Sequence, residues 1–249
     1  MKSKKRINFE QMRVRLALVM ALVALSLTSV AQPPRFLSDE ELPDAVVFLP
    51  TPPSVDDRLF FNDWTQYQWG KTERETEAGK LAYFDAKHGS WFNIHESFNE
   101  AFGLKVTAEG TPAIYALCGR AISDAHAVNR RAKNYHRRIR PYVQFNEPSL
   151  VPESEEEERT DFSYPSGHSS RGWITALVLA EINPAATTQL FKRAMTFAQG
   201  RVIVGYHYQS DVEASRLVAM STFVALQSDP EFITALDEAR KEFKRLTGK

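Results

Sequence analysis

Apolar residues recur every third or fourth position along most of this chain, and that spacing marks one buried face of an α-helix. The clearest run predicts a helix from Pro112 to about Tyr135, with an apolar stripe formed by Ile114, Leu117, Cys118, Ile122, Ala125 and Val128. Strand-like alternation is confined to a brief stretch, Arg201–Val204. These patterns predict an all-α fold class, a single-domain helical bundle.

The same periodicity predicts further helices at 57–86, Trp91–Phe102, Gly167–Ile182, Ala186–Gln199, Tyr206–Leu226 and Glu231–Leu246. Residues 142–164 break the pattern with Pro148, Pro152 and the acidic run Glu153–Glu158. We therefore predict an exposed loop there, with solvated acidic side chains. Because the chain has 249 residues and 43% of them are hydrophobic, it can bury one sizeable core.

The N-terminus is predicted to be a secretory signal peptide over residues 1–31. Six basic residues precede an apolar run from Leu16 to Leu27, and Ser29–Ala31 supplies the small residues of a cleavage site. A membrane anchor is the alternative, although the run is shorter than the roughly 20 residues of a spanning helix. Met12 is an alternative start. Cleavage would release a soluble protein into the periplasm, without a stable membrane anchor.

The remainder divides into a proline-rich extended lead-in, residues 32–56, and an all-helical domain, residues 57–249. Residues 1–31 hold six of the 31 basic residues and one of the 31 acidic ones, which leaves 25 against 30 and a net charge of −5. An acidic protein is a poor candidate for nucleic-acid binding. The single cysteine, Cys118, excludes an internal disulfide and is predicted to be a buried small hydrophobic residue.

Three short segments contain residues that can bind a phosphate group and attack it: Lys133-x6-Arg140-Pro141, Pro165-Ser166-Gly167-His168 and Arg201-x5-His207-x3-Asp211. Lys133, Arg140 and Arg201 would bring three cations to one site, which suits the dispersed negative charge of a phosphoryl group in transfer. Other basic residues nearby are interpreted as a mostly solvated face: Arg130, Arg131, His136, Arg137 and Arg138.

The third segment holds a candidate nucleophile. His207 and Asp211 are four residues apart, so on a helix they would lie one turn from each other on the same face. A carboxylate bonded to one imidazole nitrogen leaves the other with a free lone pair, which can attack phosphorus and form a phosphohistidine. Two alternatives remain for this pair alone: a surface salt bridge and a pair of metal ligands.

The middle segment precedes an apolar helical run. Ser166 is predicted to cap that helix, and Gly167 would let the backbone approach a bound anion at the helix N-terminus. His168 could protonate the leaving group and then activate water. A serine-hydrolase elbow is the alternative, but it requires glycine where Arg171 stands and a buried strand before it. No motif asks for a metal, and His95-Glu96 lacks the second histidine of a zinc helix.

Together the three segments resemble the signature of the phosphatidate-phosphatase-2 and vanadium-haloperoxidase superfamily, and within it the bacterial class A non-specific acid phosphatases. The resemblance covers essentially the whole chain after the signal, including Phe48–Pro50, Ser97–Gly103, Ala176–Pro184 and Gly205–Val212. It implies the helical bundle of that superfamily and an exported, metal-independent enzyme without a cofactor. Small-molecule phosphomonoesters would be its substrates, and phosphotransfer to alcohol acceptors and homo-oligomer formation are compatible with the resemblance.

Residue by residue, the resemblance implies His207 as the nucleophile, Asp211 as its orienting partner and His168 as the general acid. The phosphate-binding residues that it implies are Lys133, Arg140, Ser166, Gly167 and Arg201. Two positions depart from the family pattern: Gly200 replaces the usual serine, and Phe162 replaces the usual glycine. A vanadate-dependent haloperoxidase, a lipid phosphatase or a phosphate-binding protein without turnover are the alternative functions.

Overall fold

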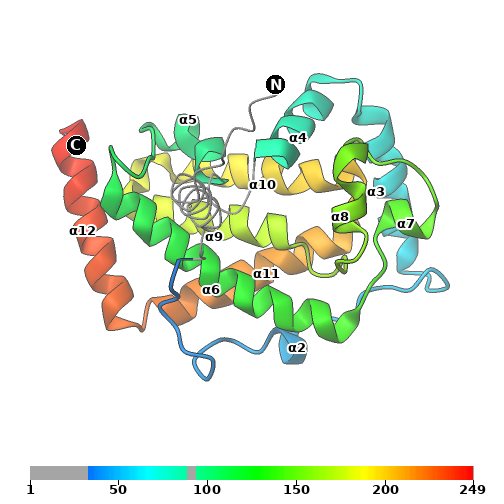
Figure 1. The fold of residues 1–249 in the computed structure, drawn as a ribbon, viewed down its shortest axis with the longest axis horizontal. Coiled ribbons are helices and arrows are strands. Elements are labelled where there is room, and N and C mark those ends of the chain that lie inside the picture. Colours follow the sequence, from blue (N-terminus) through cyan, green and yellow to red (C-terminus); the bar gives the residue numbers. More distant parts are fainter. Residues whose placement is uncertain (1–32, 89–93, 249) are drawn as a thin grey trace, which may run out of the picture. The chain divides into compact units, whose positions relative to one another are not determined.

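The computed structural model describes residues 33–88 and 94–248, and the described part of the chain contains helices but no β-strand. This confirms the predicted all-α fold class (Figure 1). The predicted signal peptide and the alternative start at Met12 lie outside the described residues. In chain order the elements, with η for 3-10 helices, are α2 (Ala45–Phe48), α3 (Phe60–Glu73), α4 (Glu77–His88), η1 (Ile94–Phe98), α5 (Asn99–Phe102), α6 (Pro112–His136), α7 (Pro141–Gln144), η2 (Pro152–Ser154), α8 (Glu155–Glu158), α9 (Gly167–Ile182), η3 (Pro184–Ala186), α10 (Thr187–Val204), α11 (Gln209–Leu226) and α12 (Pro230–Thr247).

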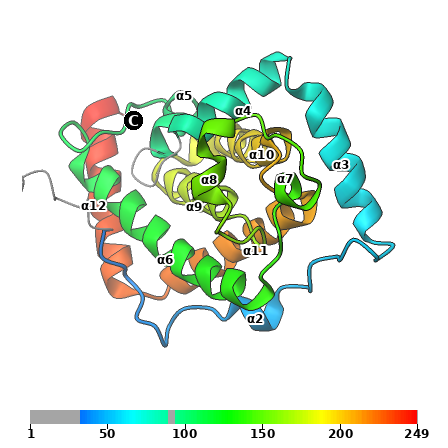
Figure 2. The same ribbon diagram turned by 45° about the vertical axis from the view of Figure 1, so that its right-hand side comes forward.

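Helix α9 is the centre of the bundle and packs against α6, α10 and α11, while α12 packs against α6 (Figures 1 and 2). Its apolar residues Ile174, Val178 and Leu179 are fully buried. A helix that is covered on all sides is apolar nearly all round, and α9 fits that rule. None of the helices in the described ranges combines the length and apolarity needed to cross a bilayer.

The helix predicted at Ala186–Gln199 was too short: α10 continues through the strand-like stretch Arg201–Val204, which forms its last turn. The helix ends at Gly205, which adopts φ +88° and donates its N–H to carbonyls of that turn. Val202 and Val204 are fully buried there. Burial against neighbouring helices therefore outweighs the preference of β-branched residues for strands.

The segment predicted to be an extended lead-in, residues 32–56, is described from residue 33 and packs onto the bundle. The buried carboxylate of Asp124 on α6 accepts hydrogen bonds from the backbone N–H groups of Phe36 and Leu37, both at 3.1 Å. The Phe36 ring meets Phe232 of α12 edge-on at 5.4 Å. The short helix α2 also lies in this segment, capped by Asp44. The free cysteine, Cys118, is fully buried on α6, as predicted.

Two glycines show how closely α10 is packed by its neighbours. A Cβ on Gly70 of α3 would lie 2.8 Å from the carbonyl oxygen of Val202, so α3 can approach α10 only with glycine there. A Cβ on Gly200 would lie 3.4 Å from Cβ of Ala82 on α4, an ordinary contact. The departure at Gly200 therefore falls on a helix contact with α4.

We expect Gly70→Ala to lower the free energy of unfolding by about 1–3 kcal/mol, because the added methyl group collides with backbone. Gly200→Ala is the matched control, and we expect it to be within about 1 kcal/mol of the parent protein, since alanine is the better helix former. Urea unfolding followed by circular dichroism measures both. Equal stability of Gly70→Ala and the parent would contradict the close packing of α3 on α10.

Candidate active site

Residues from the three sequence segments line one cavity of about 560 Å³. Lys133 comes from the last turns of α6, and Arg140 from the residue that precedes α7. Arg201 belongs to the last turn of α10, and His207 to the connection between α10 and α11. The first turn of α9 adds Gly167 and His168. Six of the eight predicted site residues thus meet at the same cavity.

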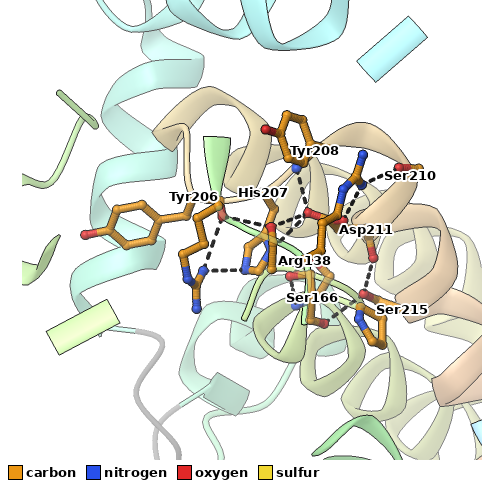
Figure 3. A network of polar contacts seen from close by, with 12 residues as sticks. Arg138, Ser166, Tyr206, His207, Tyr208, Ser210, Asp211 and Ser215 are labelled. Carbon is orange, nitrogen blue, oxygen red and sulfur yellow. Dashed lines mark hydrogen bonds and ion pairs between the residues drawn. The ribbon is translucent and has the colours of Figure 1, made fainter. Parts of the chain in front are cut away.

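The pairing of His207 with Asp211 is present, but not on one helix as predicted. Helix α11 begins at Gln209, and Asp211 caps it by accepting the Tyr208 N–H at 2.8 Å. This cap holds Asp211 Oδ2 3.5 Å from His207 Nδ1 (Figure 3). The expected proximity therefore comes from the capping turn.

The other nitrogen of His207 faces a cation of the cavity. Arg140 Nη1 lies 3.1 Å from His207 Nε2 and 3.2 Å from the carbonyl oxygen of Tyr206. Because a guanidinium can only donate, Nε2 must accept and Nδ1 must carry the ring proton. The contacts of both nitrogens thus select the tautomer whose lone pair is on Nε2.

Ser163 is a neighbour of this pair that the sequence did not identify. Its hydroxyl donates to Asp211 Oδ2 at 2.5 Å, and its oxygen lies 3.4 Å from His207 Nδ1. The preceding residue, Phe162, contributes its backbone carbonyl, which accepts a hydrogen bond from Lys133. The unusual side chain at position 162 therefore leaves this contact intact.

Ser166 caps α9 as predicted, because its hydroxyl accepts the Ser169 N–H at 3.3 Å. It is fully buried and does not line the cavity, and its backbone N–H donates to the carbonyl oxygen of Asp211 at 3.1 Å. Gly167 lies beside Lys133, since a Cβ at Gly167 would be 3.8 Å from Lys133 Cε. The N-terminus of α9 is therefore held against both the Asp211 turn and the cationic side of the cavity.

His168 is buried and stacks on Phe197 of α10, with ring centroids 4.6 Å apart and planes 8° from parallel. Burial, together with Arg201 and Arg171, lowers the pKa of His168 well below 6.5. Burial and the cations Arg140 and Lys133 do the same to the pKa of His207. Both imidazoles are therefore neutral at neutral pH.

Burial lowers the pKa values of two cations that line the cavity. Burial, followed by repulsion from Arg140, lowers the pKa of Lys133 to about 8. Burial lowers the pKa of Arg201 to about 10. Within the described residues, Arg201 Nε and Nη1 are buried without a hydrogen-bond partner. A buried guanidinium in that state favours an anionic ligand. No group of three or more potential metal-ligating side chains occurs in the described ranges.

Glu158, the last residue of the acidic run, and Asp161 shortly after it are not simply solvated, which corrects the prediction for this end of the run. Asp161 Oδ2 lies 2.8 Å from Lys133 Nζ and 3.0 Å from Arg140 Nη2. Glu158 contacts the same Nη2 of Arg140. Burial alone would raise the pKa of Asp161, but attraction to Lys133 and Arg140 lowers this pKa to about 2. Two carboxylates therefore compete with any anion for these cations. The one sequence signal is that Asp161 stands four residues before Pro165, where the middle segment begins.

Arg138 is the second correction. The sequence suggests that it belongs to a solvated face, but only 8% of its side chain is exposed. Its guanidinium forms ion pairs with Asp211 at 2.6 Å and with Asp63 at 2.7 Å. Arg131 and Arg137, by contrast, are exposed as predicted.

An all-helical fold with a buried cationic cavity and a histidine–aspartate pair defines a class of anion-binding enzymes, and comparison with known proteins identifies it. The chain belongs to the PAP2 superfamily, whose model matches residues 111–232, and within it to the non-specific acid phosphatases. It is 39% identical to the non-specific acid phosphatase of Providencia stuartii, over 85% of each chain. It is 36% identical to that of Salmonella typhi, over 89% of this chain and 88% of the other. The protein is therefore an acid phosphatase, a phosphomonoester hydrolase.

We expect Asp161→Asn to bind orthophosphate at least about tenfold more tightly, which corresponds to ~1.4 kcal/mol, because it removes a negative charge from Lys133 and Arg140. Titration calorimetry at fixed pH and ionic strength measures the affinity. Glu156→Gln is the matched control, since the Glu156 side chain is 93% exposed. Unchanged or weaker binding to Asp161→Asn would show that the carboxylate does not compete with the anion.

Proposed function

We propose that this acid phosphatase hydrolyses phosphomonoesters of broad structure through a phosphohistidine intermediate on His207. The observation that carries the proposal is the pair of contacts that the two ring nitrogens of His207 make. Its Nδ1–H faces Asp211 and Ser163, while Nε2 accepts from Arg140 at 3.1 Å within the cationic cavity. A nitrogen nucleophile requires a free lone pair, so Arg140 would have to turn from Nε2 to the phosphate oxygens when substrate binds.

In the first step, His207 Nε2 attacks phosphorus, the bond between phosphorus and the ester oxygen breaks, and the leaving alkoxide takes a proton. We assign that proton to His168, which lines the same cavity. In the second step, neutral His168 removes a proton from water, and the resulting hydroxide attacks phosphorus and releases His207. The products are an alcohol and orthophosphate, so atoms and protons balance.

The charge that develops on the equatorial oxygens would be stabilised by Lys133, Arg140 and Arg201, with the Gly167 N–H group at the start of α9. Ser166 supports that helix end through its cap. In the absence of substrate, Asp161 and Glu158 neutralise part of this cation cluster. Substrate phosphate would therefore have to displace their carboxylates from Arg140.

An alcohol can replace water in the second step, so phosphotransfer to alcohol acceptors belongs to the same proposal. We also propose that residues 1–31 are a signal peptide and that residues 32–249 act after export to the periplasm. The basic and apolar order of the N-terminal residues supports export. The net charge of −5 after residue 31 argues against nucleic acid as a partner.

Rapid mixing with a 32P-labelled phosphomonoester is expected to trap an acid-labile phosphoenzyme that is absent from His207→Ala. We expect kcat of this variant to fall by at least about 10⁴-fold, because the nucleophile is removed. His136→Ala, at a histidine outside the cavity, is the control. Activity should survive a chelator and be blocked by vanadate. Label on any residue other than His207 would refute the assignment.

The pH dependence of kcat/KM is expected to be bell-shaped, with its maximum below ~6.5, the ordinary histidine pKa. A histidine is charged only below its pKa, and the pKa values of His168 and His207 are both lowered. The charged His168 needed in the first step is therefore lost as the pH rises towards neutrality. Neutral His207 persists to more acidic pH than an ordinary histidine.

The variant His168→Asn separates this effect from the ionisation of the substrate, which is common to both proteins. In this variant, the fall of kcat/KM at alkaline pH should no longer include the loss of the His168 proton. We expect its kcat/KM to fall by about 10²–10⁴-fold for an alkyl phosphate and much less for p-nitrophenyl phosphate, whose leaving group needs no proton. Equal losses for both substrates, or wild-type activity that rises into the alkaline range, would contradict His168 as general acid.

A further inference from the structure

Asp211 is fully buried, and each of its carboxylate oxygens has a separate set of partners (Figure 3). Oδ2 accepts from the Ser163 hydroxyl at 2.5 Å and from the Tyr208 N–H at 2.8 Å, and it faces His207 Nδ1. Oδ1 accepts from Arg138 Nη1 at 2.6 Å. The orientation of the carboxylate thus depends on Arg138 on one side and on the His207 turn on the other.

Arg138 is itself held in place on several sides. Its Nη2 donates to Asp63 Oδ2 at 2.7 Å, and its Nη1 donates to the Ser210 hydroxyl at 2.7 Å. Asp63 in turn accepts from the N–H and the hydroxyl of Ser210, at 2.8 and 2.6 Å. The guanidinium carbon lies 4.1 Å from the centroid of the Tyr208 ring. Arg138 therefore has little freedom to move away from the carboxylates.

The elements that supply these groups are far apart in the sequence. Asp63 belongs to α3, Arg138 to the segment between α6 and α7, and Asp211 to the first turn of α11. One buried guanidinium stands between two buried carboxylates, so the three groups carry a net charge of −1. Removal of the guanidinium alone would leave two uncompensated carboxylates in the interior, which is strongly unfavourable.

We infer that Arg138, anchored by Asp63, is a positioning residue for the phosphatase reaction: it holds Asp211 turned so that Oδ2 faces His207. The inference rests on the proposed attack by His207. Because Oδ1 is bound to Arg138, the carboxylate cannot rotate freely, and His207 Nδ1 keeps its acceptor. That contact retains the tautomer with the lone pair on Nε2. Arg138 thus acts through two other residues and does not touch the phosphate.

Specific consequences separate positioning from a merely structural role. A mispositioned Asp211 should slow the attack on phosphorus, so kcat falls while KM changes little. Loss of a carboxylate facing an imidazole also lowers the imidazole pKa. The acid limb of kcat/KM, which reports the protonation of His207, should therefore move to lower pH. A structural defect would lower the melting temperature without either kinetic change.

The test compares the wild type, the double variant Arg138→Met/Asp63→Asn and Arg138→Lys. The double variant removes one cation and one anion, so the charge of the buried group stays at −1 and the chain is expected to fold. The control is Lys71→Met/Glu147→Gln, which removes a partly buried ion pair of 3.0 Å elsewhere in the bundle. Each protein is measured for melting temperature, kcat and KM across pH, and the rate of phosphoenzyme formation.

In the double variant we expect kcat and the rate of phosphoenzyme formation to fall by about 10²-fold, as for a misplaced reacting group. KM should stay within about twofold, and the acid limb should move to lower pH. Arg138→Lys keeps the charge and should recover part of kcat. The control should lose only thermal stability.

A folded double variant with wild-type kcat and pH profile would overturn the positioning role. An equal fall of kcat in the control would also overturn it, as would a rise in KM at unchanged kcat. If the double variant does not fold, Arg138→Lys decides: the inference fails if its kcat and acid limb equal those of the wild type. A wild-type enzyme that forms no phosphoenzyme on His207 would refute the proposed function itself, and the inference with it. Failure of the inference alone leaves the wild-type phosphoenzyme intact.

Discussion

The buried carboxylate of Asp211 is the constraint on which the site depends. An ionised group in the interior must be paired and hydrogen-bonded, or it would be protonated or the fold would open. Its partners come from separate elements: Arg138 after α6, Ser163 before α9 and the Tyr208 N–H at the start of α11. Satisfying this one carboxylate therefore brings together the segments that carry the site residues.

The cation cluster poses the opposite problem, because positive charges repel one another when they are buried together. The lowered pKa values of Lys133 and Arg201 express that repulsion and the loss of water. Asp161 and Glu158 relieve it in part by pairing with Arg140 and Lys133. The same carboxylates stabilise the cavity without a bound anion, and they lower its affinity for an anion. Stability and affinity thus oppose each other at these two side chains.

Most of the fold could be predicted, since the helical spacing of apolar residues is enough to locate α6, α9, α11 and α12. The end of α10 was placed too early, at Gln199, because the short run Val202–Val204 has no helical period of its own. In the site, motif spacing selected Lys133, Arg140 and His207, which do line the cavity. Arg138 was missed because six other basic residues lie between positions 130 and 140, and nothing in their order shows which guanidinium is buried. Asp161 was missed because a loop carboxylate gives no periodic signal.

The sequence by itself determined which chemical groups are present and which of them are near one another along the chain. That was sufficient for the helical fold, the cap at Ser166 and the family. Only the tertiary structure decided which charges are buried and with whom they pair, because burial depends on contacts between distant segments, such as that between Asp63 and Ser210, which are 147 residues apart. For the same reason, the tautomer of His207 follows from Arg140 and Asp211 together, and neither residue alone specifies it.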